Sequence, residues 1–163
     1  MHNKTIAHGC SFTRYKWPCW PKFVSWFNGG MTMLNKGRSA SGNETISRVV
    51  INSAMKHKDI AHMYIMWSAV DRYEVITLDE GVDHLGGRIT YRVWDDDFKW
   101  STWFGGHRLP DKHDYYRRHF WNEQHQQYRT LEHIQRAQMF LDKKAIPYTM
   151  MIFNKDVLRD TFY

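Results

Sequence analysis

A serine that follows a short apolar segment is the residue best placed for nucleophilic chemistry. Thr5 to His8 is typical of a buried strand, and Gly9 permits a sharp turn directly after it. Ser11 lies in that turn, where its hydroxyl would meet a substrate. Acyl transfer needs such a hydroxyl, a base that accepts its proton, and donors that stabilise the developing oxyanion. Ser11 is therefore a candidate nucleophile, although a plain turn or helix-cap serine is the simpler interpretation of this residue taken alone.

Two further loops contain residues suited to complete such a site. Gly42 and Asn43 precede a predicted helix, so the Gly42 amide and the Asn43 side chain are candidate oxyanion donors; ordinary helix capping explains the same residues equally well. Ser11 would add its own backbone N–H. Ser68 and Asp71 follow another predicted strand and are candidate supporting residues.

No residue is singled out as the general base. The sequence has ten histidines, of which His8 lies beside the nucleophile turn. Four others lie in or after a later aromatic-rich segment: His107, His113, His119 and His125. A surface or packing role is the simpler interpretation of each.

Cysteine and metal chemistry are less favoured. Cys10 is the alternative nucleophile, although a small buried residue is the simpler interpretation. Cys10 and Cys19 are the only cysteines and lack the spacing of a metal-binding pair, so we expect reduced thiols. The later histidines do not form same-face helical pairs, so we predict neither a metal nor a cofactor.

Alternating strands and helices would position these loops. The expected elements, in order, are a strand at 5–8, a short amphipathic helix at 20–27, a strand at 31–34, a helix that follows Asn43 and a strand at 62–67. The second helix would have one apolar face, formed by Ile46, Val49, Val50, Ser53 and Ala54. Gly29 and Gly30 end the first helix, and Ser41 with Glu44 matches a capping box at the start of the second. This order predicts a parallel sheet with helices on both faces, whose functional loops gather at the carboxyl ends of its strands.

The second half of the chain differs in character. Periodicity fails from about 79 to 122, which indicates an irregular aromatic-rich insertion with a hairpin around Gly86-Gly87. Its aromatic residues and Asp95 to Asp97 would suit stacking on sugars or docking of a partner, although a small satellite core is the simpler interpretation. A long helix begins near Glu123, and a further strand follows at 148–153.

Length and composition indicate one globular domain over residues 1–163. The 16% aromatic content, with eight Trp, exceeds what such a core requires, so some rings should be exposed.

Residues 1–60 hold nine Lys/Arg against two Asp/Glu. This charge would attract nucleic acid or an anionic glycan, but the basic residues are scattered and no nucleic-acid motif accompanies them, so a solvated surface is favoured. Without a signal segment or a long apolar run, a cytoplasmic protein without membrane contact is expected.

Three segments together resemble the Ser-Gly-Asn-His (SGNH, GDSL-type) hydrolase superfamily. His8 to Thr13 is similar to its first block, with Cys10 in place of an Asp; Asn35 to Asn43 is similar to the second, and Met66 to Arg72 to a divergent third. The resemblance implies a three-layer α/β/α sandwich with a mostly parallel, flavodoxin-like sheet, shortened at its C-terminal end. It also implies the roles given above to the serine and to the oxyanion donors.

The sequence departs from this family at two points. Val70 takes the position of an Asn that normally donates to the oxyanion, and no Asp-x-x-His follows the last predicted strand. An esterase acting on a small ester or an acetylated carbohydrate therefore competes with a non-catalytic binding or structural component, for example one that assembles into an oligomer or a phage particle. A flavodoxin-like nucleotide binder is a third alternative, but the glycine-rich phosphate motifs are missing.

Overall fold

The computed structural model describes residues 4–39, 41–70, 72–77, 89–92, 99–104, 119 and 122–152. Its main sheet has four parallel strands in the order β2-β1-β3-β7. These strands are β1 (Lys4–His8), β2 (Met33–Asn35), β3 (Ile60–Trp67) and β7 (Tyr148–Ile152). The predicted α/β class with a parallel sheet is confirmed.

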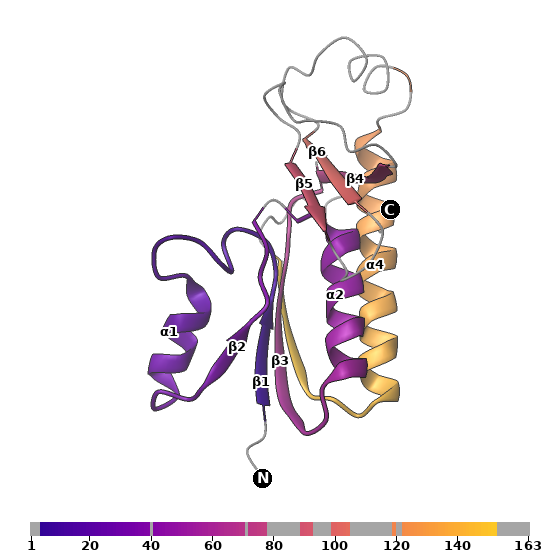
Figure 1. The fold of residues 1–163 in the computed structure, drawn as a ribbon. Helices are drawn as coiled ribbons and strands as arrows, with labels where there is room; N and C mark the ends of the chain where they lie inside the picture. The colour runs from indigo at the N-terminus through magenta and orange to yellow at the C-terminus, as the bar shows by residue number, and fades with distance from the viewer. Residues whose placement is uncertain are drawn as a thin grey trace.

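Helices cover this sheet unequally. The helices α2 (Asn43–Lys56) and α4 (Glu123–Lys143) lie side by side on one face, and α1 (Trp20–Phe27) lies on the other side next to β2 (Figure 1). In the part of the chain that the structure describes, the second helical layer thus consists of one short helix. The three-layer sandwich stays a prediction.

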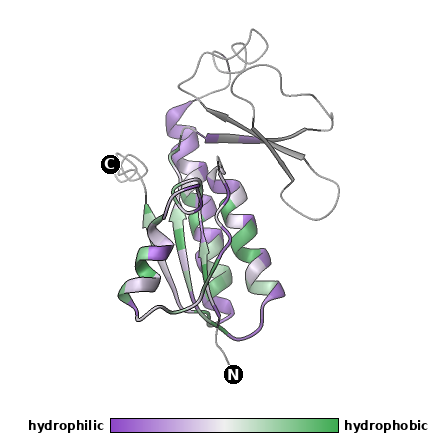
Figure 2. Ribbon diagram, turned by 60° about the vertical axis from the view of Figure 1, so that its left-hand side comes forward, coloured by the Kyte–Doolittle hydropathy of each residue, from purple (hydrophilic) through white to green (hydrophobic). Residues whose placement is uncertain are grey.

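The core lies between the sheet and the pair α2 and α4. Alternate residues of β3, namely Met63, Ile65 and Trp67, are fully buried there, as expected of a strand with one face against helices. The apolar face predicted for the second helix is confirmed, since all its members are buried in α2: Ile46, Val49, Val50, Ser53 and Ala54. Hydrophobic and hydrophilic residues alternate along the helices, as Figure 2 shows, and the hydrophobic residues of α2 and α4 contribute to this core.

A second, antiparallel sheet has the strand order β4-β6-β5. It comprises β4 (Arg72–Thr77), β5 (Ile89–Arg92) and β6 (Lys99–Phe104). Two of these strands, β5 and β6, fall within the segment predicted to be irregular. They were not predicted because strands of this length, rich in Thr, Tyr and Trp, show little apolar alternation. Gly86 and Gly87 lie outside the described residues; the antiparallel neighbours within that segment are β5 and β6.

Candidate functional site

The turn after β1 forms as predicted. Gly9 has a φ of 151°, which side chains rarely permit, and a Cβ there would press against the Thr13 side chain and lie 2.8 Å from the Met66 carbonyl oxygen. The N–H groups of Thr13 and Arg14 donate to the Cys10 carbonyl at 3.0 and 3.3 Å. These bonds close the turn that contains Ser11.

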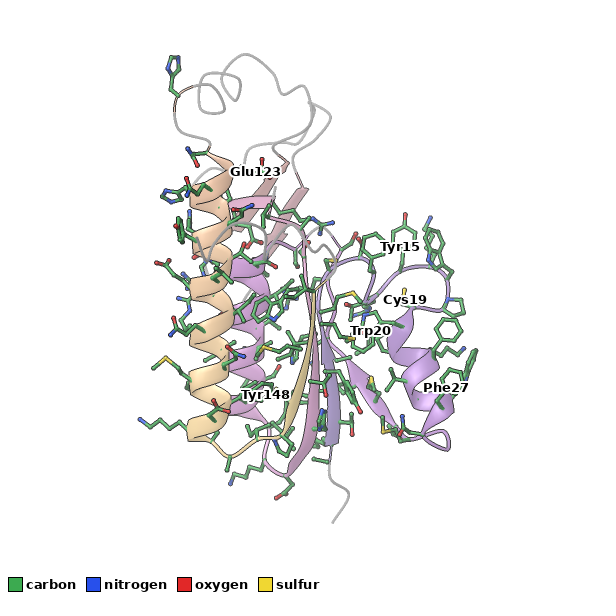
Figure 3. All side chains as sticks on the ribbon, turned by 180° about the vertical axis from the view of Figure 1, so that it is seen from behind. Tyr15, Cys19, Trp20, Phe27, Glu123 and Tyr148 are labelled. Carbon is green, nitrogen blue, oxygen red and sulfur yellow. The ribbon has the colours of Figure 1, made fainter. Side chains whose placement is uncertain are left out.

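Ser11 lines a pocket of about 390 Å³ near the carboxyl edge of the parallel sheet. The other lining residues are mostly aromatic or apolar: Phe12, Tyr15, Trp17, Pro18, Cys19, Trp20 and Met66. Figure 3 shows Tyr15, Cys19 and Trp20 on the side of the molecule that carries α1. The volume lies within the range of pockets that hold a small molecule.

The pocket wall is fixed to the strands below it through Thr13. This residue is fully buried, and its hydroxyl accepts a hydrogen bond from Trp20 Nε1 at 3.1 Å. Its carbonyl accepts from Asn35 Nδ2 at 2.7 Å, and Asn35 Oδ1 accepts from the Gly37 N–H at 2.9 Å. The first and second loops predicted to meet therefore do meet, and their contacts hold the Ser11 turn in place.

Asn43 joins the second loop to the third but does not face the Ser11 pocket. Its Nδ2 donates to the Ser68 carbonyl at 3.0 Å and to Thr130 Oγ1 at 3.1 Å, and its Oδ1 accepts from the Ser68 N–H at 2.7 Å. The side chain is buried and is not among the pocket residues. Asn43 thus acts here as a clamp on the loop after β3, since its donors are already used.

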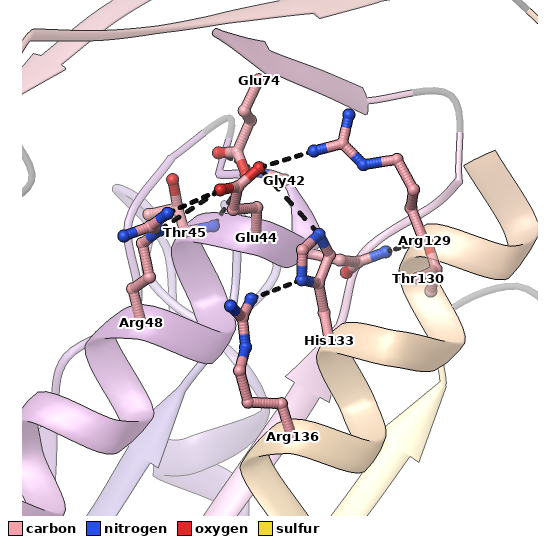
Figure 4. Close-up of polar contacts among 10 residues, drawn as sticks. Gly42, Glu44, Thr45, Arg48, Glu74, Arg129, Thr130, His133 and Arg136 are labelled. Atoms are coloured by element: carbon pink, nitrogen blue, oxygen red, sulfur yellow. Dashed lines mark hydrogen bonds and ion pairs between the residues drawn. The ribbon is translucent and has the colours of Figure 1, made fainter. Parts of the chain in front are cut away.

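Gly42 is likewise engaged within the protein. Its N–H donates to Glu74 Oε1 at 2.8 Å, and the Thr45 N–H donates to Glu74 Oε2 at 2.7 Å (Figure 4). The predicted capping box of Ser41 and Glu44 is wrong. The N-cap is Gly42, which has no side chain to accept a hydrogen bond from the first turn of the helix. A carboxylate from β4 takes that place because it accepts from two first-turn amides at once.

The Glu74 carboxyl is almost completely buried, and burial raises its pKa. The hydrogen bonds from Thr45 and Gly42 act in the opposite direction. Sequence reasoning missed Glu74, although the β-branched residues of 72–77 are a signal for the strand that carries it.

Glu44 belongs to a polar cluster between α2 and α4. Its carboxylate pairs with Arg48 at 2.8 Å and with Arg129 at 2.9 Å, and His133 Nε2 lies 4.0 Å from it (Figure 4). Burial lowers the pKa of His133 to about 4, so its ring is neutral near pH 7. A cavity of about 10 Å³, the space of one water, lies among these side chains, and none of its lining residues also lines the Ser11 pocket.

Among the described residues, no side chain forms a hydrogen bond with the Ser11 hydroxyl. Cys10 is fully buried with a free thiol, which agrees with its simpler interpretation as a small buried residue. Ser68 is buried, and His125 is exposed on the first turn of α4. His119 is exposed as well. Several other predicted positions lie outside the described residues: Asp71, Asp95 to Asp97, His107 and His113.

Comparisons with known proteins do not assign a family. No protein-family model matches this sequence, and no curated protein matches it. The resemblance to SGNH hydrolases therefore depends on the three loops alone and stays a prediction.

The described ranges contain neither a candidate metal site nor a candidate membrane span. No group of three or more His, Cys, Asp or Glu side chains there is placed to hold a metal ion. None of the helices in those ranges has both the length and the apolar character needed to span a bilayer.

His8 gives the folded state a dependence on pH. It is fully buried, and in the described part of the structure neither ring nitrogen has a hydrogen-bond partner. Burial, assisted by Lys36, lowers its pKa from 6.5 to about 3. The unfolded chain therefore binds a proton more readily between these two values. The contribution of neutral His8 to stability is complete above pH 6.5 and is lost as the pH falls toward 3.

We expect denaturant titrations to show a free energy of unfolding that falls below pH 6.5, with His8 contributing up to about 1.4 kcal/mol per pH unit. The His8→Leu variant should have a shallower slope and, because two unsatisfied nitrogens are removed, should be about 1 kcal/mol more stable at neutral pH. His133 retains a slope of the same sign in that variant. An identical pH profile for both proteins would contradict the assignment to His8.

Proposed function

We propose that this protein is a non-catalytic binding component whose ligand occupies the Ser11 pocket. The observation that carries the proposal is the internal use of two predicted oxyanion donors. The Gly42 N–H is bonded to Glu74, and Asn43 Nδ2 is bonded to Ser68 and Thr130.

These bonds bear directly on catalysis. An oxyanion hole works because its donors already point at the position where negative charge develops. Here Gly42 would first have to give up a carboxylate at 2.8 Å, and Asn43 would have to leave two buried acceptors. Loss of a single such donor reduces catalysis by about 10²- to 10³-fold in well-studied hydrolases. The pocket keeps its shape and its aromatic wall without these donors, which favours binding over turnover.

The pocket chemistry indicates a ligand with a flat or apolar ring face. Tyr15 and Trp17 lie with their ring centroids 4.2 Å apart and tilted by 50°, and both line the pocket. Aromatic walls of this kind provide contact area, and the half-buried Ser11 hydroxyl supplies a polar group that orients the ligand. The sugar implied by the family resemblance has such a face.

A serine esterase is the second candidate, because Ser11 does lie in a pocket directly after β1 of a parallel sheet. Hydrolysis of p-nitrophenyl acetate by purified protein and by Ser11→Ala separates the two functions. We expect neither protein to accelerate hydrolysis appreciably, so that their rates agree within about twofold, since the oxyanion donors are occupied. A loss of about 10³-fold or more in Ser11→Ala would instead establish a serine nucleophile and overturn the binding proposal.

A further inference from the structure

We propose that the Ser11 pocket and the outer side of α1 together bind single-stranded nucleic acid without sequence preference. The inference rests on the proposed binding function and names the class of ligand. It is carried by an unusual set of exposed rings and by the charge of the segment that holds them.

The exposed rings form what we call the aromatic face. Its members are between 45% and 89% exposed: Phe12, Tyr15, Trp17, Phe23, Trp26 and Phe27. The predicted helix at 20–27 is confirmed, but two of its apolar residues, Phe23 and Phe27, are exposed, and Phe27 is the most exposed of the rings. Figure 3 shows Tyr15 and Phe27 on the same side of the molecule. The aromatic face therefore continues from the pocket along α1.

The spacing on α1 aligns this surface. Phe23, Trp26 and Phe27, together with Lys22, occupy positions i, i+1, i+4 and i+5, which share one side of a helix. The Phe23 and Trp26 ring centroids are 5.3 Å apart, and Lys22 Nζ lies 5.1 Å from the Trp26 ring centroid. A cation thus lies beside rings that are free to stack on a ligand.

The segment that carries the aromatic face has charge of one sign. Residues 1–43 contain six Lys/Arg and no Asp/Glu. Of these, Arg14, Lys16 and Lys22 are exposed and lie in the turn region and helix that hold the exposed rings. A polyanion is attracted by this segment, and no carboxylate within it opposes the attraction.

Single-stranded nucleic acid satisfies each of these features at once. Every base has a face that stacks on an aromatic ring, and each phosphate can pair with Lys or Arg. The pocket is large enough for one base, and α1 is about 12 Å long, so a few nucleotides cover the surface. A neutral glycan has no anionic group that could pair with the Lys and Arg side chains. A flat lipid surface would leave the pocket empty. A second copy of the chain would bring like charges together.

The test uses a fluorescently labelled oligothymidine of about 12 nucleotides, with binding measured by anisotropy. We expect binding that weakens roughly 10- to 20-fold between about 50 and about 200 mM salt if three cations pair with phosphates. The Trp17→Ala variant should bind about tenfold more weakly or worse. Tyr128→Ala is the matched control, since Tyr128 is an aromatic residue of similar exposure, 50%, on α4 and away from this surface. It should bind like the unmodified protein.

Three results would overturn the inference. The first is duplex DNA bound as tightly as the single strand. The second is an equal effect of Trp17→Ala and Tyr128→Ala. The third is no oligothymidine binding at low salt, whether or not a neutral oligosaccharide or vesicles with anionic lipid bind. Binding of the oligosaccharide alone would leave the proposed function standing, whereas ester hydrolysis abolished in Ser11→Ala would remove that function itself.

Discussion

Replacement of Gly9 with alanine is expected to lower the free energy of unfolding by about 3 kcal/mol or more. The backbone φ of 151° is strained for any residue with a side chain, and the new Cβ would lie 2.8 Å from the Met66 carbonyl oxygen and against Thr13. Neither neighbour can move away from the added Cβ, since Met66 is part of β3 and Thr13 is fully buried. Urea titration of the two proteins measures the difference.

Gly29 and Gly30 provide the matched controls. Both have positive φ, 69° and 77°, but a Cβ at either position would meet nothing within 4 Å. Alanine there should cost only the backbone term, about 1–2 kcal/mol. The difference between Gly9→Ala and these variants therefore isolates the crowding beneath the Ser11 turn. Equal losses at all three positions would show that this crowding does not stabilise the turn.

Removal of the Glu74 carboxyl is expected to have an effect of similar size. In Glu74→Ala the N–H groups of Gly42 and Thr45 lose their acceptor while they stay buried, which should destabilise the protein by about 2–4 kcal/mol. The start of α2 also loses a carboxyl group near its positive end. Urea titration measures the loss, and hydrogen exchange of the Gly42 and Thr45 amides locates it.

Glu74→Gln is the control, because it retains one acceptor oxygen and should lose about half as much stability. Its pH dependence gives an independent check. Since burial raises the pKa of Glu74 above 4.5, the stability linked to its proton is present below pH 4.5 and is lost as the pH rises through the folded pKa. Glu74→Gln should remove this trend, which is opposite in sign to that of His8. A Glu74→Ala protein as stable as the original would contradict the capping role.

The two destabilising variants also bear on the site. Gly9 shapes the turn that presents Ser11, whereas Glu74 occupies the amide that an oxyanion hole would need. If Glu74→Gln gained ester hydrolysis that depended on Ser11, the bond to Gly42 would be the feature that separates binding from catalysis. We expect no such gain, since Asn43 stays bonded to Ser68 and Thr130.

Much of the parallel sheet was predictable because its signals are local. The buried faces of α2 and β3 appear directly as residue spacing, and Gly9 marks the end of β1 by its conformational freedom. Once strands alternate with helices, a parallel sheet follows, and so does the meeting of the loops after its strands. The position of the Ser11 turn was therefore contained in the sequence.

The use of the polar groups in those loops was decided by the tertiary structure alone. Glu74 lies 32 residues from Gly42, and Thr130 lies 87 residues from Asn43, so no local spacing relates these pairs. Each amide forms a hydrogen bond with the acceptor that the packing brings within reach, because a buried donor without a partner is costly. The exposure of Phe23 and Phe27 has the same origin, since spacing shows which residues share a helix face but not what covers it. The sequence thus determined where the loops meet, and the packing of distant elements determined which of their groups are still free to act.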